Sequence, residues 1–337
     1  MAMILSKTPV RIAFGGGGTD VEPYSSDYGG YVVNATIDKY IRCELTRRED
    51  NKINIYSSDK LYNYEFDSIG ELSDIKDPSS IIEAILQLML PKIGLDIHID
   101  VEPPKQAGLG ASASLSTALI SGLLKIENKE IILDQVAEKG YYIEQHILKN
   151  EGGRQDQYAA VYGGFNGLVF SGNSNVKVEK LKISDSFVKK IEKNLLLYYT
   201  GEPHTSGDLV RKQVKAYIDN KEKSKNSLDK LKEIAYEIRD SLVSEDIERF
   251  GALLSEDMET KTKFNPLLTT DYMKDLNKLI INNGAIGGRI CGAGGGGCMI
   301  WLLKSGKKKK IKKLLEKHQG EIINFQFVNK GLELLED

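Results

Sequence analysis

Alternating apolar and polar positions divide the first third of the chain into short strands and a helix. Residues 95–101 (LDIHIDV) alternate strictly, which predicts a strand with one buried face. Residues 52–57 and 62–66 alternate in the same way on either side of a short break, as the two arms of a hairpin do. In residues 79–89 the apolar positions recur at helical spacing, and Pro91 ends that pattern. Shorter apolar segments predict further strands at 10–14, 31–34 and 40–46.

The pattern in the middle of the chain predicts helices followed by strands. Residues 112–125 predict one helix, and residues 130–149 predict one or two more. The polar segment 151–158 (EGGRQDQY) breaks the helical pattern, which resumes at 159–162. Two short strands are expected next, at 168–170 and 176–181.

Long charged helices dominate the second half. We place a domain boundary close to the apolar strand 195–199 and predict two domains, 1–190 and 191–337, because a chain of 337 residues exceeds the usual size of one domain. Two strands flanking a helix near the C-terminus, with helices before them, indicate a small α+β sandwich. The predicted helices are 208–219, 227–242, 246–261, 270–282 and 307–318, and the two strands are 299–303 and 322–327.

Composition and charge narrow the class of protein. Hydrophobic residues make up 41% of the chain and charged residues 28%, which is typical of a globular enzyme. The net charge of −2 provides no global basic field, so we predict no nucleic-acid partner. No run of 18 apolar residues and no signal-peptide core occur, so we predict no membrane partner and a cytoplasmic location. Three cysteines without a CxxC pair predict buried free thiols rather than a zinc site.

The stretch PPKQAGLGASASLSTAL (103–119) places glycines and small side chains between a predicted strand and a predicted helix. Its G-x-G-x-x-A core matches a dinucleotide-binding fingerprint, but a second helical segment follows where that fold requires a parallel strand. No GK[ST] follows the glycines, so a Walker loop is excluded. Glycines admit a ligand close to the backbone and a helix N-terminus attracts anions. The stretch therefore indicates phosphate binding, with a tight packing turn as the alternative.

Two further glycine-rich stretches favour the binding interpretation. They are residues 9–20 (PVRIAFGGGGTD) and residues 287–298 (GGRICGAGGGGC), and each lies next to a strand-like apolar segment. One glycine run alone is compatible with a floppy turn. Three such runs in one chain predict that separate segments of backbone converge on a shared ligand.

Taken together, the three stretches resemble the motifs of the GHMP kinases, a family that includes galactokinase, homoserine kinase and mevalonate kinase. The motifs occur in the family's order, and the match runs from residue 9 to residue 297. The resemblance implies an α+β GHMP kinase fold, with a left-handed βαβ unit in the N-terminal domain and a ferredoxin-like α/β sandwich as the C-terminal domain. It also implies an active site between the domains, with ATP and Mg²⁺ as cofactors.

Several segments are similar to one subgroup of this family, which phosphorylates D-glycero-D-manno-heptose 7-phosphate at its anomeric hydroxyl. The resemblance implies a small phosphosugar as the partner molecule and a 1,7-bisphosphate as the product. L-Fucose or another hexose as the sugar, and a non-catalytic sensor of sugar and ATP, are the alternatives. The oligomeric state stays open, with a homodimer as one option. The similar segments are TPVRIAFGGGGTDVEPY, GGYVVNATIDKY, GGRQDQYAAVYGGFNG and ICGAGGGG.

The resemblance assigns the chemistry to four side chains. Asp156 matches the family's catalytic aspartate, which accepts or orients the proton of the attacking hydroxyl, a contribution of typically ~10²–10⁴-fold. Arg11 aligns with a cation presented to the transferred phosphate or to the base. Ser112 and Glu144 match the two Mg²⁺ ligands, and Mg²⁺ needs few protein oxygens when it shares a triphosphate. The ATP-binding residues implied by the central motif are Gly108, Leu109, Gly110, Ala111, Ser112 and Ser114.

The sugar-binding residues follow from the first motif. Thr19 and Asp20 match the T-D pair that binds sugar hydroxyls in galactokinase-like members. Those enzymes carry Glu-His just before this pair, whereas Gly17 and Gly18 here leave room for a bulkier sugar. Arg154 is the remaining residue that the resemblance implies for sugar binding. A phosphosugar also needs a cationic or N–H-rich pocket for its own phosphate, and the candidates are Arg154, Arg289, Lys261 and residues 200–206.

Overall fold

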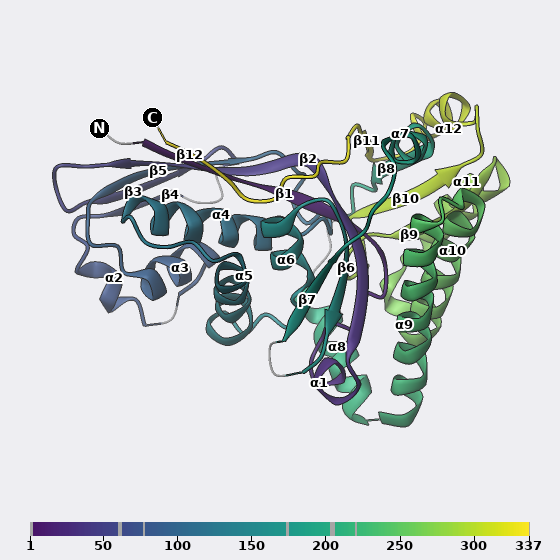
Figure 1. Ribbon diagram of the computed structural model, residues 1–337, viewed down its shortest axis with the longest axis horizontal. Coiled ribbons are helices and arrows are strands. Elements are labelled where there is room, and N and C mark those ends of the chain that lie inside the picture. The colour runs from purple at the N-terminus through teal and green to yellow at the C-terminus, as the bar shows by residue number, and fades with distance from the viewer. Residues whose placement is uncertain are drawn as a thin grey trace.

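Two β-sheets, each covered by helices, make up the molecule (Figure 1). The computed structural model describes residues 3–59, 63–76, 78–172, 175–202, 206–219 and 221–336. Within these ranges, no helix combines the length and the apolar character that crossing a bilayer requires. All three cysteines are free and buried, as the sequence predicted.

The first sheet is built on two long antiparallel strands, β1 (Met3–Gly15) and β2 (Gly30–Arg47). The sequence predicted two strands in place of β2, because its apolar pattern is interrupted. In the structure, Asp38 and Lys39 form an unpaired bulge where the register with β1 shifts, and the strand continues beyond them. The other strands of this sheet are β3 (Ile53–Ser57), β4 (Asn63–Phe66), β5 (Leu95–Val101), β6 (Phe165–Phe170), β7 (Val176–Lys180) and β12 (Glu333–Glu336).

The order of this sheet contains the βαβ connection that the family resemblance implied. The strands run β12-β1-β2-β5-β3-β4, while β6 and β7 extend from the Gly30 end of β2. β3 and β4 form the predicted antiparallel hairpin. β3 and β5 are parallel, and the chain between them passes through β4 and two helices.

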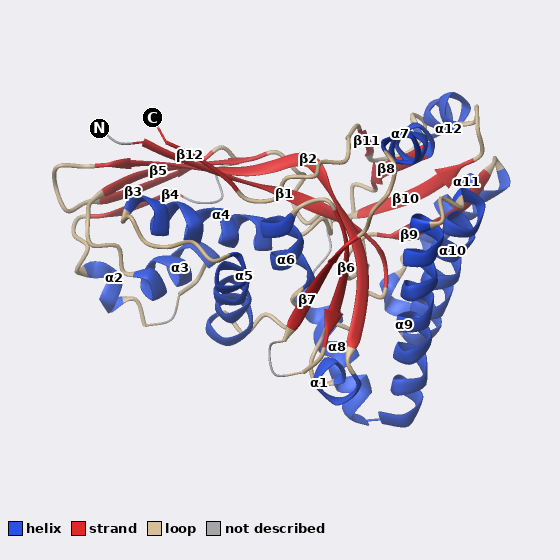
Figure 2. Ribbon diagram, in the orientation of Figure 1, coloured by secondary structure: helices blue, strands red, loops and turns tan. Residues whose placement is uncertain are grey.

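One face of the first sheet is covered by helices, and α4 (Ala111–Ile126) lies centrally among them (Figure 2). Almost all of α4 is buried, and its small side chains let it approach the sheet closely: a Cβ added at Gly122 would lie 2.5 Å from a methyl group of Leu45. The other helices of this half are α1 (Tyr24–Tyr28), α2 (Glu71–Asp74), α3 (Ile81–Met89), α5 (Leu133–Tyr142), the π-helical turn η1 (Ile143–Ile147) and α6 (Gln155–Tyr162).

The second sheet is smaller and antiparallel, with the order β11-β8-β10-β9. Helices α10 and α11 contact this sheet, and α9 lies beside α10 and contacts β1 and β2 of the first sheet (Figure 1). Its strands are β8 (Leu195–Tyr199), β9 (Ala285–Ile290), β10 (Cys298–Leu303) and β11 (Glu321–Ile323). The helices of this half are α7 (Asp185–Asn194), α8 (Ser206–Asp219), α9 (Lys221–Val243), α10 (Ile247–Phe264), the 3₁₀ turn η2 (Pro266–Leu268), α11 (Asp271–Asn282) and α12 (Lys308–Leu315).

A shared apolar core joins the two halves. Phe14 on β1 packs edge-on against Phe250 on α10, with ring centroids 5.2 Å apart, and Ile300 on β10 lies in the same cluster. Removing this surface from water favours a fixed arrangement of the two sheets. The predicted boundary between residues 190 and 191 lies inside α7, and the division into residues 1–190 and 191–337 stays a prediction.

Candidate active site

A cavity of about 760 Å³ lies where the three glycine-rich stretches meet. Residues 17–18, 106–113 and 292–293 all contribute to its wall. Backbone bonds fix the third stretch against the central one, because Cys298 N–H donates to the Ala107 carbonyl at 2.9 Å. Segments far apart in the sequence therefore form one cavity, as their glycine content predicted.

The N-terminus of α4 opens into this cavity. Its N-cap is Gly110, whose φ of +80° is a left-handed conformation that favours glycine. No side chain caps the helix, and Ala111, Ser112 and Ala113 of its first turn line the cavity. The first N–H groups of a helix have no acceptor within the helix, so this end suits an anionic group such as a phosphate.

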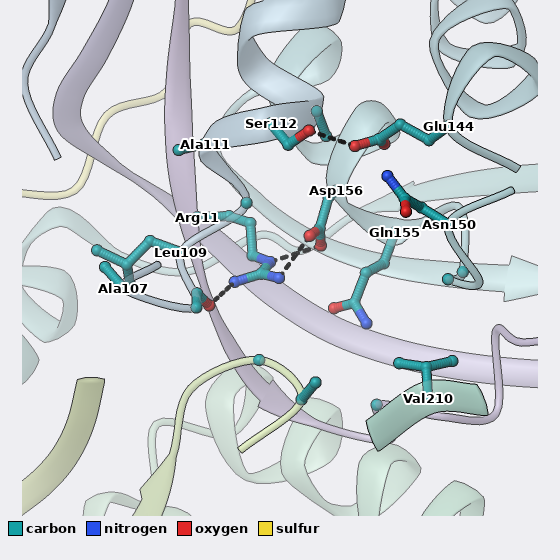
Figure 3. Close-up of a pocket in the computed structure, with 18 of the residues that line it drawn as sticks. Arg11, Ala107, Leu109, Ala111, Ser112, Glu144, Asn150, Gln155, Asp156 and Val210 are labelled. Carbon is teal, nitrogen blue, oxygen red and sulfur yellow. Dashed lines mark hydrogen bonds and ion pairs between the residues drawn. The ribbon is translucent and has the colours of Figure 1, made fainter. Parts of the chain in front are cut away.

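Asp156 and Arg11 form the central charged pair of the cavity (Figure 3). Arg11 projects from β1 and donates two hydrogen bonds to the Asp156 carboxylate, from Nε to Oδ1 at 2.7 Å and from Nη2 to Oδ2 at 2.6 Å. A third bond joins Arg11 Nη1 to the Gly108 carbonyl at 2.5 Å. The Arg11 side chain is 5% exposed and that of Asp156 is 25% exposed, so the aspartate faces the cavity and the arginine supports it from behind.

The position of Asp156 differs from the sequence expectation. Residues 151–158 were predicted to interrupt the helical pattern, but α6 already begins at Gln155. Asp156 therefore lies in the first turn of a helix, where N–H groups favour a negative charge. The helix also fixes the direction of its side chain, which a loop would leave variable.

Ser112 and Glu144 face each other across a second part of the wall (Figure 3). The Ser112 hydroxyl donates to Glu144 Oε1, and the Gln157 amide donates to Glu144 Oε2. Withdrawal from water raises the pKa of Glu144 to about 7. No cluster of three or more histidine, cysteine or acidic side chains that could hold a metal occurs in the described part of the chain. A pair of oxygen ligands nevertheless fits Mg²⁺, which is commonly held by one or two carboxylates together with phosphate oxygens and water.

Asp20 lies buried on another side of Asp156. Its carboxylate accepts from Gly18 N–H at 3.0 Å, from Gln155 N–H at 3.3 Å and from the Gln155 amide at 3.2 Å. Burial raises the pKa of Asp20, and the nearby charge of Asp156 acts in the same direction. A Cβ on Gly153 would lie 1.8 Å from Asp20 Oδ2, so this glycine is what lets the carboxylate occupy its position.

Comparison with known proteins places the chain in a family. The model of the GHMP kinases N terminal domain matches residues 79–164, and the model of the GHMP kinases C terminal matches residues 238–319. The D-glycero-alpha-D-manno-heptose 7-phosphate kinase of Campylobacter jejuni is 32% identical over 337 residues, which cover 99% of both chains. The chain belongs to the GHMP kinase family. Family membership together with this full-length relative identifies the chain as a sugar kinase, which transfers a phosphoryl group to a hydroxyl acceptor.

Two further relatives bear on this GHMP kinase. A crystal structure of a D-glycero-D-manno-heptose 1-phosphate kinase from Bacteroides thetaiotaomicron is 25% identical, with a TM-score of 0.80 and 98% of both chains covered. The bifunctional fucokinase/GDP-fucose pyrophosphorylase of Arabidopsis thaliana is 26% identical over 330 residues. That match covers 92% of this chain but only 31% of the plant protein.

Two of the residues predicted for this GHMP kinase lie behind the cavity wall. The Thr19 hydroxyl donates to the Gly16 carbonyl and accepts from Tyr31 N–H, so it shapes the glycine turn from the buried side. Ser114 is buried and donates to the Pro9 carbonyl at 2.9 Å, because its position on α4 faces β1. The hydroxyl groups of Thr19 and Ser114 therefore bond the backbone, and neither residue is among the described residues that line the cavity.

Two predicted cations are also engaged elsewhere. Arg154 makes ion pairs with Glu22 and Glu138, and its guanidinium lies 3.9 Å from the centre of the Tyr141 ring. Arg289 is buried against Asp257, with the charged atoms 3.1 Å apart. Neither arginine is among the described residues that line the cavity. Residues 203–205 of the candidate phosphate-binding stretch 200–206 lie outside the described residues.

The sequence analysis assigned no role to the glutamines that line the cavity. Gln155 and Gln157 flank Asp156, and the first of them bonds Asp20 while the second bonds Glu144. The motif GGRQDQ contained both, and their positions beside the aspartate were a usable signal. Gln213 on α8 reaches the cavity from the second half of the chain, and no feature of its sequence surroundings marked it.

Proposed function

We propose that this GHMP kinase transfers the γ-phosphoryl group of ATP to the anomeric hydroxyl of D-glycero-D-manno-heptose 7-phosphate, giving the 1,7-bisphosphate. The supporting observation is the Arg11–Asp156 pair, which lies beside the uncapped start of α4 in a cavity lined by all three glycine-rich stretches. The choice of sugar is supported by the heptose 7-phosphate kinase that is 32% identical along nearly the whole chain.

In this proposal Asp156 receives the proton of the sugar hydroxyl. The hydroxyl oxygen forms a bond to the γ-phosphorus, the bond from that phosphorus to the bridging oxygen breaks, and ADP leaves with the electron pair. Arg11 orients the carboxylate through a bidentate pair of hydrogen bonds and adds positive charge close to the transferred phosphoryl group. Because the transition state of phosphoryl transfer is loose, correct placement of the hydroxyl contributes much of the rate.

The ATP phosphates would lie at the start of α4, where its free N–H groups point into the cavity. Ser112 and Glu144 would hold Mg²⁺. A bound Mg²⁺ would neutralise charge on the phosphates. The hydrogen bond between Ser112 and Glu144 joins two oxygen atoms of the kind that Mg²⁺ prefers as ligands. Both oxygen atoms therefore already lie close enough together to bind one ion.

A kinase assay over a panel of sugars tests this proposal. The panel should hold D-glycero-D-manno-heptose 7-phosphate, the free heptose, L-fucose and D-mannose, each with ATP and Mg²⁺, and phosphorus NMR should locate the new phosphate. We expect the highest kcat/KM on the heptose 7-phosphate, with the product phosphorylated at C1. Equal kcat/KM on L-fucose would contradict the choice of sugar.

The fucokinase alternative is kept because a relative with that activity is 26% identical over 92% of this chain. The same panel decides between the two sugars. A non-catalytic sensor is the remaining alternative, and it predicts binding of sugar and ATP without ADP release. The presence of Asp156, Ser112 and Glu144 at one cavity favours turnover over that option.

A further inference from the structure

A phosphorylated sugar needs a cation at the end of the cavity away from the transferred phosphoryl group, and this inference rests on the proposed function above. Three described residues of the cavity wall are cationic: Arg11, Lys105 and Lys261. Arg11 is fully engaged with Asp156 and the Gly108 carbonyl. Lys105 lies on the side of β3, where its ammonium group is 3.4 Å from the backbone oxygen of Asp59.

Lys261 comes from α10 and reaches the cavity next to the first glycine run. Its Nζ donates to the Gly292 carbonyl at 3.0 Å and would lie 3.4 Å from a Cβ added at Gly17. The next glycine, Gly18, is approached in the same way by the Gln213 amide, 2.8 Å from its added Cβ. The ammonium group and the amide thus lie close to the backbone of these two glycines, and a side chain at Gly18 would displace the amide.

Lys261 has no ion-pair partner within the described part of the chain, where no carboxylate lies within 4.0 Å of its Nζ. The two buried arginines nearby differ in this respect, because Arg11 and Arg289 each pair with an aspartate. Keeping an unpaired ammonium group partly buried is costly unless an anion joins it. Lys261 also has two donors left after its bond to Gly292, which a phosphate can accept.

We infer that Lys261 binds the phosphate that the sugar substrate already carries, with Gln213 as the second donor, and that the lack of side chains at Gly17 and Gly18 lets both donors reach the cavity wall. The sugar would then extend from Asp156, across the two glycines, to Lys261. In this arrangement Lys261 selects a phosphosugar over the free sugar and takes no part in the transfer of the γ-phosphoryl group.

The test compares Lys261→Met with Lys263→Met, a matched change at an exposed position of the same helix that does not line the cavity. KM and kcat should be measured for heptose 7-phosphate and for free heptose, and heptose 7-phosphate binding should be measured by calorimetry without ATP. We expect Lys261→Met to raise KM for the phosphosugar roughly 10- to 100-fold, as loss of a charged hydrogen bond does. Its kcat, and kcat/KM for the free heptose, should stay within about threefold of wild type. Lys261→Arg should recover part of the affinity because it restores the charge.

Two outcomes would overturn the inference. An unchanged KM for the phosphosugar in a folded Lys261→Met protein would show that the phosphate binds elsewhere. An equal loss on the free and the phosphorylated sugar, carried by kcat, would instead assign Lys261 to the transferred phosphoryl group. If the wild-type protein turns over a different sugar, the proposed function fails by itself, and the same comparison is made with the phosphorylated and free forms of that sugar.

Discussion

Asp156 is held by Arg11 from one side only, which leaves its other lone pairs directed toward the cavity. Asp156→Asn should therefore lower kcat by roughly 10²- to 10⁴-fold, because the amide cannot accept the proton of the sugar hydroxyl. The affinity for ATP should change less than a few fold, since the start of α4 is untouched. Steady-state kinetics and nucleotide titration measure the two quantities, and thermal unfolding serves as the control for folding. Near-normal turnover would remove Asp156 from the role of base.

The environment of Lys261 gives its proposed role a pH signature. Burial lowers the pKa of Lys261 to about 8, and the positive charges of Arg289 and Arg11 act in the same direction, while Asp257 and Asp20 oppose the shift. The ammonium group is thus charged below about pH 8 and neutral above it. A sugar phosphate is already a dianion above pH ~6, so only the lysine changes between pH 7 and pH 9.

KM for the phosphosugar should therefore rise as the pH increases through about 8, and this rise should be absent in Lys261→Arg, whose side chain stays charged. A pH series of KM for both proteins measures the effect. If the wild-type KM were flat over this range, the ammonium group would not be a contact of the substrate phosphate.

At the scale of elements, the loop before α6 depends on a glycine. Gly153→Ala places a Cβ 1.8 Å from Asp20 Oδ2, whereas the neighbouring Gly152 has no atom within 4 Å of its added Cβ. We expect Gly153→Ala to destabilise the fold by about 1–3 kcal/mol through overpacking and to raise KM for the sugar by displacing Asp20. Gly152→Ala is the matched control and should leave the unfolding midpoint in urea nearly unchanged. Similar midpoints for the two variants would contradict this account of the loop.

Elements with a regular pattern were predictable from the sequence, and those shaped by distant contacts were not. β5 and β8 were predicted with their observed bounds, because their apolar residues are consecutive or strictly alternating. β9 was missed because two of its six residues are glycines. The reason lies in its neighbours, since a Cβ on Gly288 would lie 2.1 Å from the Trp301 ring. β12 was missed as well, because this short segment is a strand only through its pairing with β1 at the other end of the chain.

The candidate site follows the same division. Local motifs led to Asp156, Ser112 and Glu144, and the structure brings all three to one cavity. Ser114 shows what a motif cannot supply, because only the packing of α4 on β1 turns its hydroxyl away from the cavity. Gln213 shows the opposite case, because a helix of the second half carries it to a cavity whose motifs lie mainly in the first half. Lys261 was named from the sequence as one of several cations, and only the structure shows that it lines the cavity while Arg154 and Arg289 do not.

At the scale of the whole molecule, Asp257 connects the two halves. Its carboxylate accepts from Gly16 N–H at 3.0 Å and pairs with the buried Arg289. Asp257→Ala should lower the free energy of unfolding by about 3–5 kcal/mol, because it leaves the arginine buried without a counter-charge. Asp67→Ala removes the partner of an exposed ion pair with Lys52 and should leave the free energy of unfolding nearly unchanged. Urea denaturation followed by circular dichroism measures the free energy of unfolding of both variants. Equal losses of stability would contradict the view that Asp257 links the two halves.

The return of β12 to β1 restricts how the two halves can move. The chain leaves the first sheet once, after β7, and comes back to it once, before β12 (Figure 1). The smaller sheet is thus anchored covalently at two separate points. Any turn of the smaller sheet against the first would have to bend both connections and disturb the apolar core around Phe14, so the two attachments help to keep the walls of the cavity in place.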